Sequence, residues 1–134
     1  MGSYKIGFVA GNFDLIHPGY IKLFKFAKKY CDFLIVAIHK DPSIEKNKKF
    51  RPIHNLKERK MIIESIRYVD KTLHYKYEKD LIILLKKIPI SVRFLDNNYK
   101  YKKITGKELN IPIKWVPRNH SYSTTNLVKK IKLL

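Results

Sequence analysis

The chain has 134 residues, of which 29 are Lys or Arg and 11 are Asp or Glu, so its formal net charge is +18. This length predicts one domain, residues 1–134, and a hydrophobic fraction of 45% excludes an intrinsically disordered chain. No apolar run reaches the ~18 residues that a membrane-spanning helix needs, and the lone cysteine, Cys31, cannot form an internal disulfide. We therefore expect a cytoplasmic protein without a membrane partner.

The positive charge has three interpretations. The basic residues are spread along the chain without one dense block, which is typical of a solvated lysine surface. The same charge can gather an anionic substrate by long-range attraction. A nucleic-acid-binding module is a third alternative, but the chain carries no known nucleic-acid motif, so we expect no specific nucleic-acid partner.

Strands and helices are predicted to alternate from the first residues onward. The first strand, Tyr4–Ala10, ends at Gly11, and Pro18 stands where the first turn of a helix accepts proline. The near-continuous apolar run Phe33–Ile38 indicates a buried parallel strand. Between this strand and the next helix we expect a lysine-rich loop without periodicity.

The second half of the chain continues the alternation. Asn55 and Glu58 form a capping-box-like start for a helix that runs to about Arg67. The further predicted elements are strands 69–75, 91–95 and 111–116 and a helix at 80–87. Because Pro112 cannot donate a ladder hydrogen bond, the fifth strand should lie at a sheet edge or be short. Ser123 is expected to cap a last helix.

This alternation predicts an α/β fold. Right-handed crossovers between the strands give a single doubly wound parallel sheet of about five strands with helices on both faces. Ligands of such sheets bind beyond the carboxyl ends of the strands, where the strand order reverses. The four loops expected there are residues 11–20, 39–54, 96–103 and 117–125.

The first of these loops joins the first strand to the first helix. Its backbone N–H groups and the helix N-terminus are suited to meet an anion. Gly11 and Gly19 would allow a ligand to approach the backbone closely, and His17 can donate a hydrogen bond to a phosphate oxygen. Taken alone, the same residues also fit a tight turn followed by a helix-terminal histidine.

The second and fourth loops supply positive charge. Lysines of the second loop, including Lys46 and Lys49, can close over a triphosphate and neutralise charge that moves during transfer. In the fourth loop, Arg118 can clamp a phosphate with its planar guanidinium. Residues 123–125 would add hydroxyl and N–H groups at the start of the last helix. An exposed polar loop and an ordinary N-cap are the simpler alternatives.

Together these segments have the order and spacing of a known signature. Residues 11–20 read Gly-Asn-Phe-Asp-Leu-Ile-His-Pro-Gly-Tyr, which resembles Gly-Thr-Phe-Asp-x-x-His-x-Gly-His of nucleotidyltransferases. Arg51-Pro52, Glu58-Arg59 and the closing Ser-Thr-Thr of 123–125 resemble further elements of that family. The resemblance covers nearly the whole chain, is closest to small bacterial glycerol-3-phosphate cytidylyltransferases, and implies a Rossmann-like sheet.

The resemblance also implies an activity and a set of site residues. It implies a homodimeric cytidylyltransferase that transfers CMP from CTP to a phosphorylated polyol such as glycerol-3-phosphate, with Mg²⁺ accompanying the triphosphate and no separate metal ligands. The catalytic residues carried over are His17, Lys49 and Arg118. The nucleotide-binding residues carried over are Gly11, Asn12, Phe13, Asp14, Gly19, Tyr20, Asp96, Ser123, Thr124 and Thr125. Phosphate or acceptor contacts are expected from Arg59 and Lys46.

Two departures from the signature leave other interpretations open. Tyr20 stands where the family has its second histidine, and a phenol can donate one hydrogen bond but cannot carry positive charge. Residues 95–99 read Leu-Asp-Asn-Asn-Tyr, where the family has a glycine followed by two acidic residues and an aromatic residue. This segment is expected on the nucleotide or acceptor side of the site. The alternatives are therefore an adenylyltransferase that uses ATP and a non-catalytic nucleotide-binding homologue.

Overall fold

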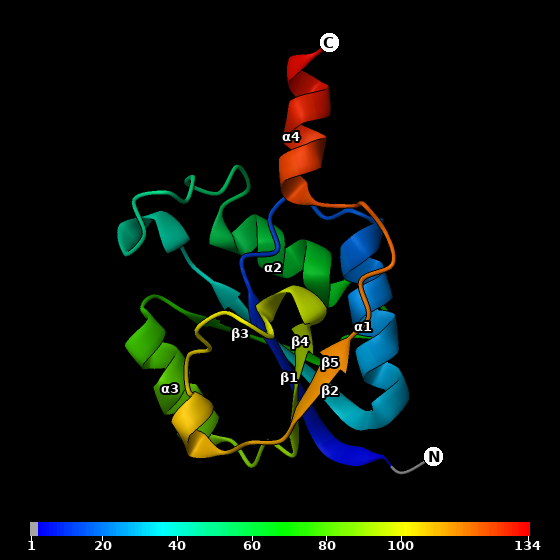
Figure 1. Ribbon diagram of the computed structural model, residues 1–134, viewed down its shortest axis with the longest axis vertical. Coiled ribbons are helices and arrows are strands. Elements are labelled where there is room, and N and C mark those ends of the chain that lie inside the picture. Colours follow the sequence, from blue (N-terminus) through cyan, green and yellow to red (C-terminus); the bar gives the residue numbers. More distant parts are fainter. Residues whose placement is uncertain (1–2) are drawn as a thin grey trace.

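Five parallel strands form the sheet on which the site is built. The computed structural model describes residues 3–134, and the strands stand in the order β3-β2-β1-β4-β5 (Figure 1). Their bounds are β1 Tyr4–Gly11, β2 Cys31–His39, β3 Lys71–Tyr75, β4 Val92–Asp96 and β5 Ile113–Val116. The chain moves outward from β1 through β2 and β3, then crosses back to β4 and β5. The strand order therefore reverses beside β1, as in the doubly wound sheet that the sequence predicts.

Helices join the strands and follow the last one. Within residues 3–134 the α-helices are α1 Pro18–Tyr30, α2 Leu56–Glu64, α3 Glu78–Lys87 and α4 Thr124–Lys132. The capping box expected for α2 is complete: the Asn55 side chain accepts from the Glu58 N–H at 2.8 Å, and the Glu58 side chain accepts from the Asn55 N–H at 2.9 Å. Two of the four N–H groups left unbonded at a helix start are satisfied in this way.

The sheet separates two hydrophobic cores, because successive residues of a strand point to opposite faces. On one face, Val36 of β2 is buried with Phe24 of α1 and Ile63 of α2. On the other face, Ala37 of β2 is buried with Leu85 of α3. Both faces of the central strands are therefore covered, which explains why residues 33–38 of β2 are all apolar rather than apolar at alternate positions.

The ends of several elements differ from the sequence-based expectation. β5 lies at the sheet edge, as expected, but it begins at Ile113, and Pro112 stands just before it. The Pro112 carbonyl still accepts a hydrogen bond from the Arg93 N–H at 2.8 Å, because proline lacks only the donor. α2 ends at Glu64 rather than near Arg67, since the chain turns at this point toward β3.

The last helix, α4, stands apart from the sheet. It projects from the body of the molecule in Figure 1, and none of its residues is buried. Its side chains at the far end are exposed, including Ile131 with 51% of its surface accessible. Within residues 3–134, no helix combines the length and the apolar character that crossing a bilayer requires.

Candidate functional site

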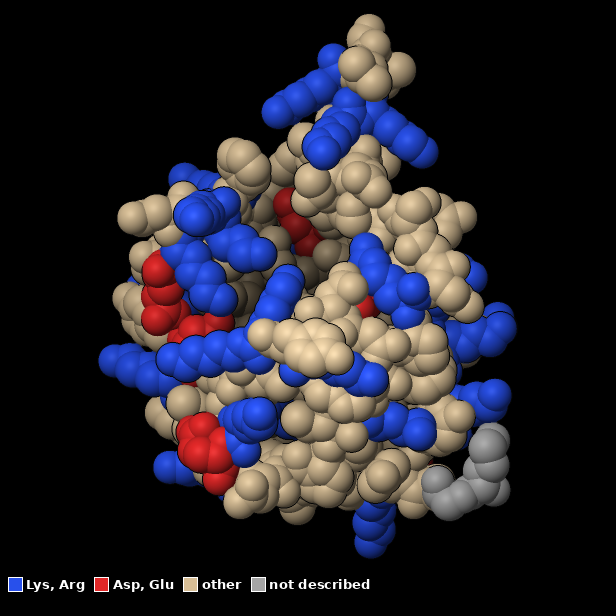
Figure 2. Space-filling model, in the orientation of Figure 1, with Lys and Arg blue, Asp and Glu red and all other residues tan. Residues whose placement is uncertain are grey.

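The predicted site loops meet beyond the carboxyl ends of β1, β4 and β5. Hydrogen bonds join the β1–α1 loop to the segment before α2 and to the start of α4, and an ion pair joins the ends of β4 and β5. The face shown in Figure 2 is hollowed beneath α4, and Lys and Arg side chains stand on both sides of the hollow. Loops far apart in the sequence therefore contribute to one region with positive charge at its margin.

His17 caps the N-terminus of α1. Its Nδ1 accepts a hydrogen bond from the Gly19 N–H at 3.1 Å. Because a nitrogen that accepts cannot also carry the proton, the neutral imidazole holds its proton on Nε2. Burial first, and then Arg118 and His120, lower the pKa of His17 below its usual value. The neutral ring with an Nε2–H donor is therefore favoured near neutral pH.

Tyr20 ties α1 to the start of α4. Its hydroxyl lies 3.3 Å from Thr124 Oγ1, and Thr124 Oγ1 donates to the Asp14 carbonyl oxygen at 2.7 Å. Because the one hydroxyl proton of Thr124 is used at that carbonyl, Tyr20 is the donor in the Tyr20–Thr124 bond. Burial raises the pKa of Tyr20, which keeps the phenol protonated. Tyr20, which stands at the position of the family's second histidine, therefore joins two helices through its hydroxyl group. Its contact with a nucleotide stays a prediction.

Asp14 fastens the β1–α1 loop to the segment before α2. Its carboxylate is 5% exposed and accepts from the Ile53 N–H at 2.7 Å and from the His54 N–H at 2.9 Å. Hydrogen bonds to a charged acceptor are roughly twice as strong as neutral ones. Together with the bond from Thr124 to its carbonyl, Asp14 joins three segments of the chain. These bonds explain its burial, whereas the expected role in nucleotide binding stays a prediction.

Arg59 is the centre of a second network, at the ends of β1 and β2. The residue is 1% exposed, and its guanidinium group donates through all three nitrogens to backbone carbonyls. Those carbonyls, at 2.6 to 3.0 Å, belong to Asn12, His39, Lys40 and His54. Arg59 therefore holds the loops in place, and a direct contact with phosphate stays a prediction.

The turn after β1 is held in a strained conformation. Phe13 and Leu15 have φ values of +52° and +50°, which cost non-glycine residues roughly 1–2 kcal/mol each. Burial of the Phe13 ring offsets this cost, since the ring contacts Tyr20 and Phe24 with centroids 5.3 and 5.4 Å away. A Cβ atom on Gly11 would lie 3.0 Å from the same ring. Glycine at this position therefore gives the ring room beneath the turn.

Arg118 and Asp96 form an ion pair across the ends of β5 and β4. Nη1 of Arg118 lies 3.2 Å from Oδ2 of Asp96, and Nη2 donates to the Tyr122 carbonyl at 2.7 Å. Oδ1 of Asp96 accepts from the Asn98 N–H at 2.9 Å. Both side chains remain partly exposed, so this pair orients the guanidinium group more than it stabilises the fold.

The remaining predicted residues lie toward the outside. Lys46 pairs with Glu78 at the start of α3, at 3.8 Å, and Lys49 is exposed with no side-chain hydrogen bond or ion pair in the described part of the chain. Ser123 caps α4 by accepting from a backbone N–H at 2.9 Å, and Thr125 is exposed. The structure thus joins the first loop to the fourth by a hydrogen bond, whereas no hydrogen bond or ion pair in the described residues links the two lysine side chains to that cluster.

His120 belongs to the same cluster, although the sequence did not single it out. It lies in the loop between β5 and α4, where its Nδ1 accepts from the Tyr122 N–H at 3.1 Å. A Cβ atom on Gly19 would lie 2.8 Å from Cε1 of His120 and 2.8 Å from Cε1 of His17. Only glycine at position 19 lets both rings come this close. Its place two residues after Arg118 was the one sequence signal available.

The carboxylates of the region are already engaged. Asp14 accepts from two backbone amides, and Asp96 accepts from Arg118 and the Asn98 N–H. In residues 3–134 there is no group of three His, Cys, Asp or Glu side chains that could hold a metal ion. A Mg²⁺ ion held mainly by nucleotide phosphates and water would not need such a group, and its presence stays a prediction.

A parallel sheet whose order reverses at β1, with a histidine-capped helix N-terminus at that point, defines a Rossmann-like nucleotide-binding domain. Residues 8–130 match the model of the cytidylyltransferase-like family, and the chain belongs to this family. The family recognised from the motifs and the fold class are both confirmed.

The curated relatives are longer proteins. The chain is 33% identical over 129 residues to the bifunctional protein HldE of Aliarcobacter butzleri, and 33% identical over 135 residues to HldE of Haemophilus influenzae. These matches cover 96% and 97% of this chain but 27% and 28% of the relatives. The chain therefore spans a little over a quarter of the length of the curated relatives it matches.

Solved structures share the fold over most of the chain. A lipopolysaccharide core biosynthesis protein of Thermoplasma volcanium superimposes with a TM-score of 0.69 at 25% identity, covering 89% of this chain and 98% of that one. A pantoate-β-alanine ligase of Francisella tularensis superimposes with a TM-score of 0.59 at 18% identity, covering 96% and 69%. The second likeness shows the fold alone.

Proposed function

We propose that this chain transfers a nucleotidyl group from a nucleoside triphosphate to a phosphorylated small molecule and releases pyrophosphate. The observation that carries the proposal is the meeting of the two ends of the chain at the N-terminus of α1. There Thr124 of α4 bonds to Tyr20 and to the Asp14 carbonyl, and the Tyr20 ring stacks on His17 with centroids 4.1 Å apart. Membership of the cytidylyltransferase-like family supports the reaction class.

The reaction would be an in-line displacement without a covalent enzyme intermediate. An oxygen of the acceptor phosphate attacks the α-phosphorus, and the bond from that phosphorus to the bridging oxygen breaks. The electron pair of that bond goes to the departing pyrophosphate. The Nε2–H of His17 and the N–H groups of the α1 N-terminus would donate to the oxygens on which this charge develops.

Arg118 and the exposed lysines would complete the binding of charge. The ion pair with Asp96 fixes the orientation of the Arg118 guanidinium group. A planar guanidinium group held in this way is suited to bind a phosphate in one geometry. Lys49 makes no competing side-chain bond in residues 3–134, so it is free to contact the triphosphate. Mg²⁺ bound to the triphosphate would supply further charge neutralisation.

Two donor and acceptor pairs are candidates. The resemblance of the motifs to glycerol-3-phosphate cytidylyltransferases favours CTP and a polyol phosphate. The relatives found, HldE proteins and a lipopolysaccharide core biosynthesis protein, favour ATP and a phosphorylated sugar. We propose adenylyl transfer to a sugar phosphate as the first candidate and cytidylyl transfer to a polyol phosphate as the second. The homodimer stays a prediction.

Thermal denaturation with each of the four nucleoside triphosphates and Mg²⁺ identifies the donor. At a concentration about a hundred times its Kd, the preferred triphosphate should raise the melting temperature of the protein by about 5 °C or more. Pyrophosphate release is then measured with that donor and a panel of sugar and polyol phosphates.

Each result distinguishes between the candidates. Stabilisation by ATP with release in the presence of a sugar phosphate supports the first candidate, and CTP with glycerol-3-phosphate supports the second. Stabilisation without release across the panel favours a non-catalytic nucleotide-binding homologue. Failure of all four triphosphates to bind would overturn the proposed function.

A further inference from the structure

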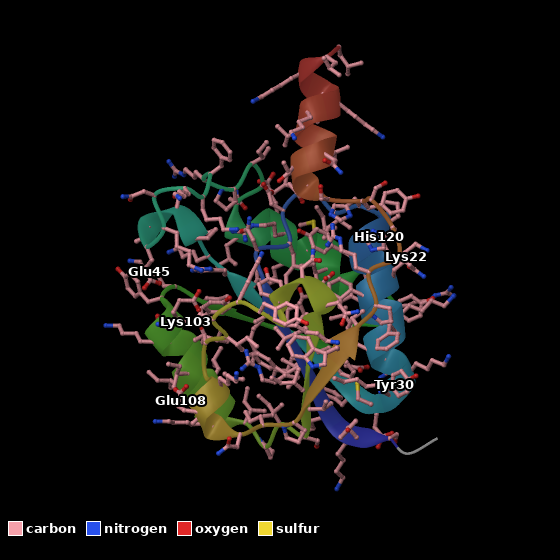
Figure 3. All side chains as sticks on the ribbon, in the orientation of Figure 1. Lys22, Tyr30, Glu45, Lys103, Glu108 and His120 are labelled. Atoms are coloured by element: carbon pink, nitrogen blue, oxygen red, sulfur yellow. The ribbon has the colours of Figure 1, made fainter. Side chains whose placement is uncertain are left out.

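Two histidines from distant parts of the chain face each other across Gly19. His17 is the N-cap of α1, and His120 comes from the loop after β5, which Figure 3 shows beside α1. The Cε1 atoms of both rings lie within 2.8 Å of the point where a Gly19 side chain would begin. The two imidazoles therefore share one small space at the helix N-terminus.

In both rings the same nitrogen, Nδ1, accepts a hydrogen bond from the backbone. Nδ1 of His17 accepts from the Gly19 N–H at 3.1 Å, and Nδ1 of His120 accepts from the Tyr122 N–H at 3.1 Å. Each neutral ring therefore carries its proton on Nε2. Neither Nε2 atom makes a hydrogen bond within residues 3–134, so each ring keeps an unbonded Nε2–H donor.

Tyr20 cannot provide such a donor in this arrangement. Its hydroxyl proton is directed to Thr124, because Thr124 uses its own proton at the Asp14 carbonyl. The sequence position that carries the second histidine of the family signature is therefore engaged in holding α4. A second donor toward a phosphate must come from another part of the chain.

We propose that His120 is a second phosphate-binding imidazole, which acts with His17 on the triphosphate and takes over in space the role that Tyr20 does not perform. This inference rests on the proposed function and names a further residue of the same site. Burial is the main cause of the lowered His17 pKa, and Arg118 and His120 lower it further, in agreement with three cationic or donor groups around one anion-binding space.

Two variants separate this role from a structural one. An Asn side chain can place its carbonyl oxygen near the former Nδ1 position, whereas Gln can place its amide N–H near the former Nε2 position. His120→Asn should keep the bond from the Tyr122 N–H and lose the donor to phosphate. His120→Gln should keep the donor and lose that loop bond. The matched control is His74→Asn, at an exposed histidine of β3.

Binding of Mg²⁺-tripolyphosphate, measured by calorimetry, is the first readout, because it needs neither base nor acceptor. His120→Asn should weaken binding about tenfold or more, as expected for loss of one hydrogen bond to a charged group. His120→Gln should stay within about threefold of the unsubstituted chain. In the unsubstituted chain, the NMR resonances of Nε2 in both His17 and His120 should shift on addition of tripolyphosphate.

The opposite order of the variants would overturn the proposal. If His120→Asn binds normally and His120→Gln binds poorly, His120 only shapes the loop. Absence of a shift at His120 Nε2, or of any tripolyphosphate binding, also overturns it. Failure of the proposed function alone has another signature: no pyrophosphate is released with any substrate pair, while tripolyphosphate binding still depends on His120 in the expected order.

Discussion

The β1–α1 loop and the lysine-rich loop between β2 and α2 both carry predicted site residues, but they are built differently. In the β1–α1 loop, Asp14 is buried with both carboxylate oxygens bonded, and His17 has one ring nitrogen bonded to the backbone. In the lysine-rich loop, Lys49 has no side-chain partner among residues 3–134, and Lys46 has one ion pair at 3.8 Å.

The β1–α1 loop holds hydrogen-bond donors that are positioned before a ligand arrives, whereas the lysines of the other loop must move to contact it. A donor already in place needs no reorganisation when charge develops, which makes it effective in a transition state. An exposed lysine can close over a ligand of variable shape, but it loses side-chain entropy when it does so. Substitutions in the first region should therefore affect both fold and activity, and those in the second should affect activity alone.

The largest effect is expected for Arg59→Leu, at a residue of α2 whose guanidinium group bonds to backbone carbonyls of both loops. This change removes the donor group from four backbone carbonyls, one of them in a buried hydrogen bond and three in part-buried ones, and an unsatisfied buried group costs about 1–3 kcal/mol. We expect the free energy of unfolding, measured with urea, to fall by at least about 3 kcal/mol. Arg67→Leu is the control, because Arg67 is exposed and contacts one Tyr68 ring. An unchanged urea midpoint for Arg59→Leu would contradict the role of this network.

His17→Ala tests the donor itself. Loss of one preorganised donor should lower the rate of pyrophosphate release about a hundredfold. The free energy of unfolding should fall by only about 1 kcal/mol, as for other N-cap substitutions. Rates and urea midpoints are compared with those of His74→Ala. Near-normal turnover in His17→Ala would remove the histidine from the proposed chemistry.

Lys49→Ala tests the exposed region. We expect turnover to fall about tenfold, because one charge is lost from the triphosphate. The free energy of unfolding should stay within about 0.5 kcal/mol, as for surface changes without partners. Lys46→Ala is the comparison, since Lys46 is held by Glu78 and should have the smaller effect on turnover. A clear loss of stability in Lys49→Ala would show that the Lys49 side chain also stabilises the fold, and would contradict the difference between the two loops.

The smallest expected effect is a pH dependence of stability that comes from His17. Its pKa is lower in the folded protein than the usual value of 6.5, so between these two pKa values the unfolded chain binds more protons. Stability should therefore fall as the pH drops below 6.5 toward the folded-state pKa. Urea midpoints at several pH values, compared between the unsubstituted chain and His17→Ala, measure this contribution. A steeper acid loss in His17→Ala would reverse the sign and contradict it.

Much of the fold followed from the sequence because its signals are local. The apolar run 33–38 indicated a strand covered on both faces, and Pro112 indicated an edge strand. The capping box at Asn55 and Glu58 is present with both of its hydrogen bonds. Such patterns depend on periodicity and on backbone chemistry within a few residues, so they can be recognised without knowledge of the neighbours.

The contacts of the candidate site residues did not follow from the sequence. Arg59 was expected at a phosphate, yet the structure shows it donating to backbone carbonyls, and no local pattern indicates that its position is 1% exposed. Asp14 and Thr124 are 110 positions apart and joined by a hydrogen bond. The order of the strands, rather than any motif, brings those two segments together.

By itself, the sequence determined an alternating parallel α/β domain, the family signature, and a histidine at the start of the first helix. Tertiary structure alone decided that Tyr20 donates to Thr124, that Asp96 orients Arg118, and that His120 meets the helix start. The physical reason is the crossing of the chain from β3 back to β4 and β5. That crossing places the last loop against the first helix, a neighbourhood that depends on packing across the whole sheet.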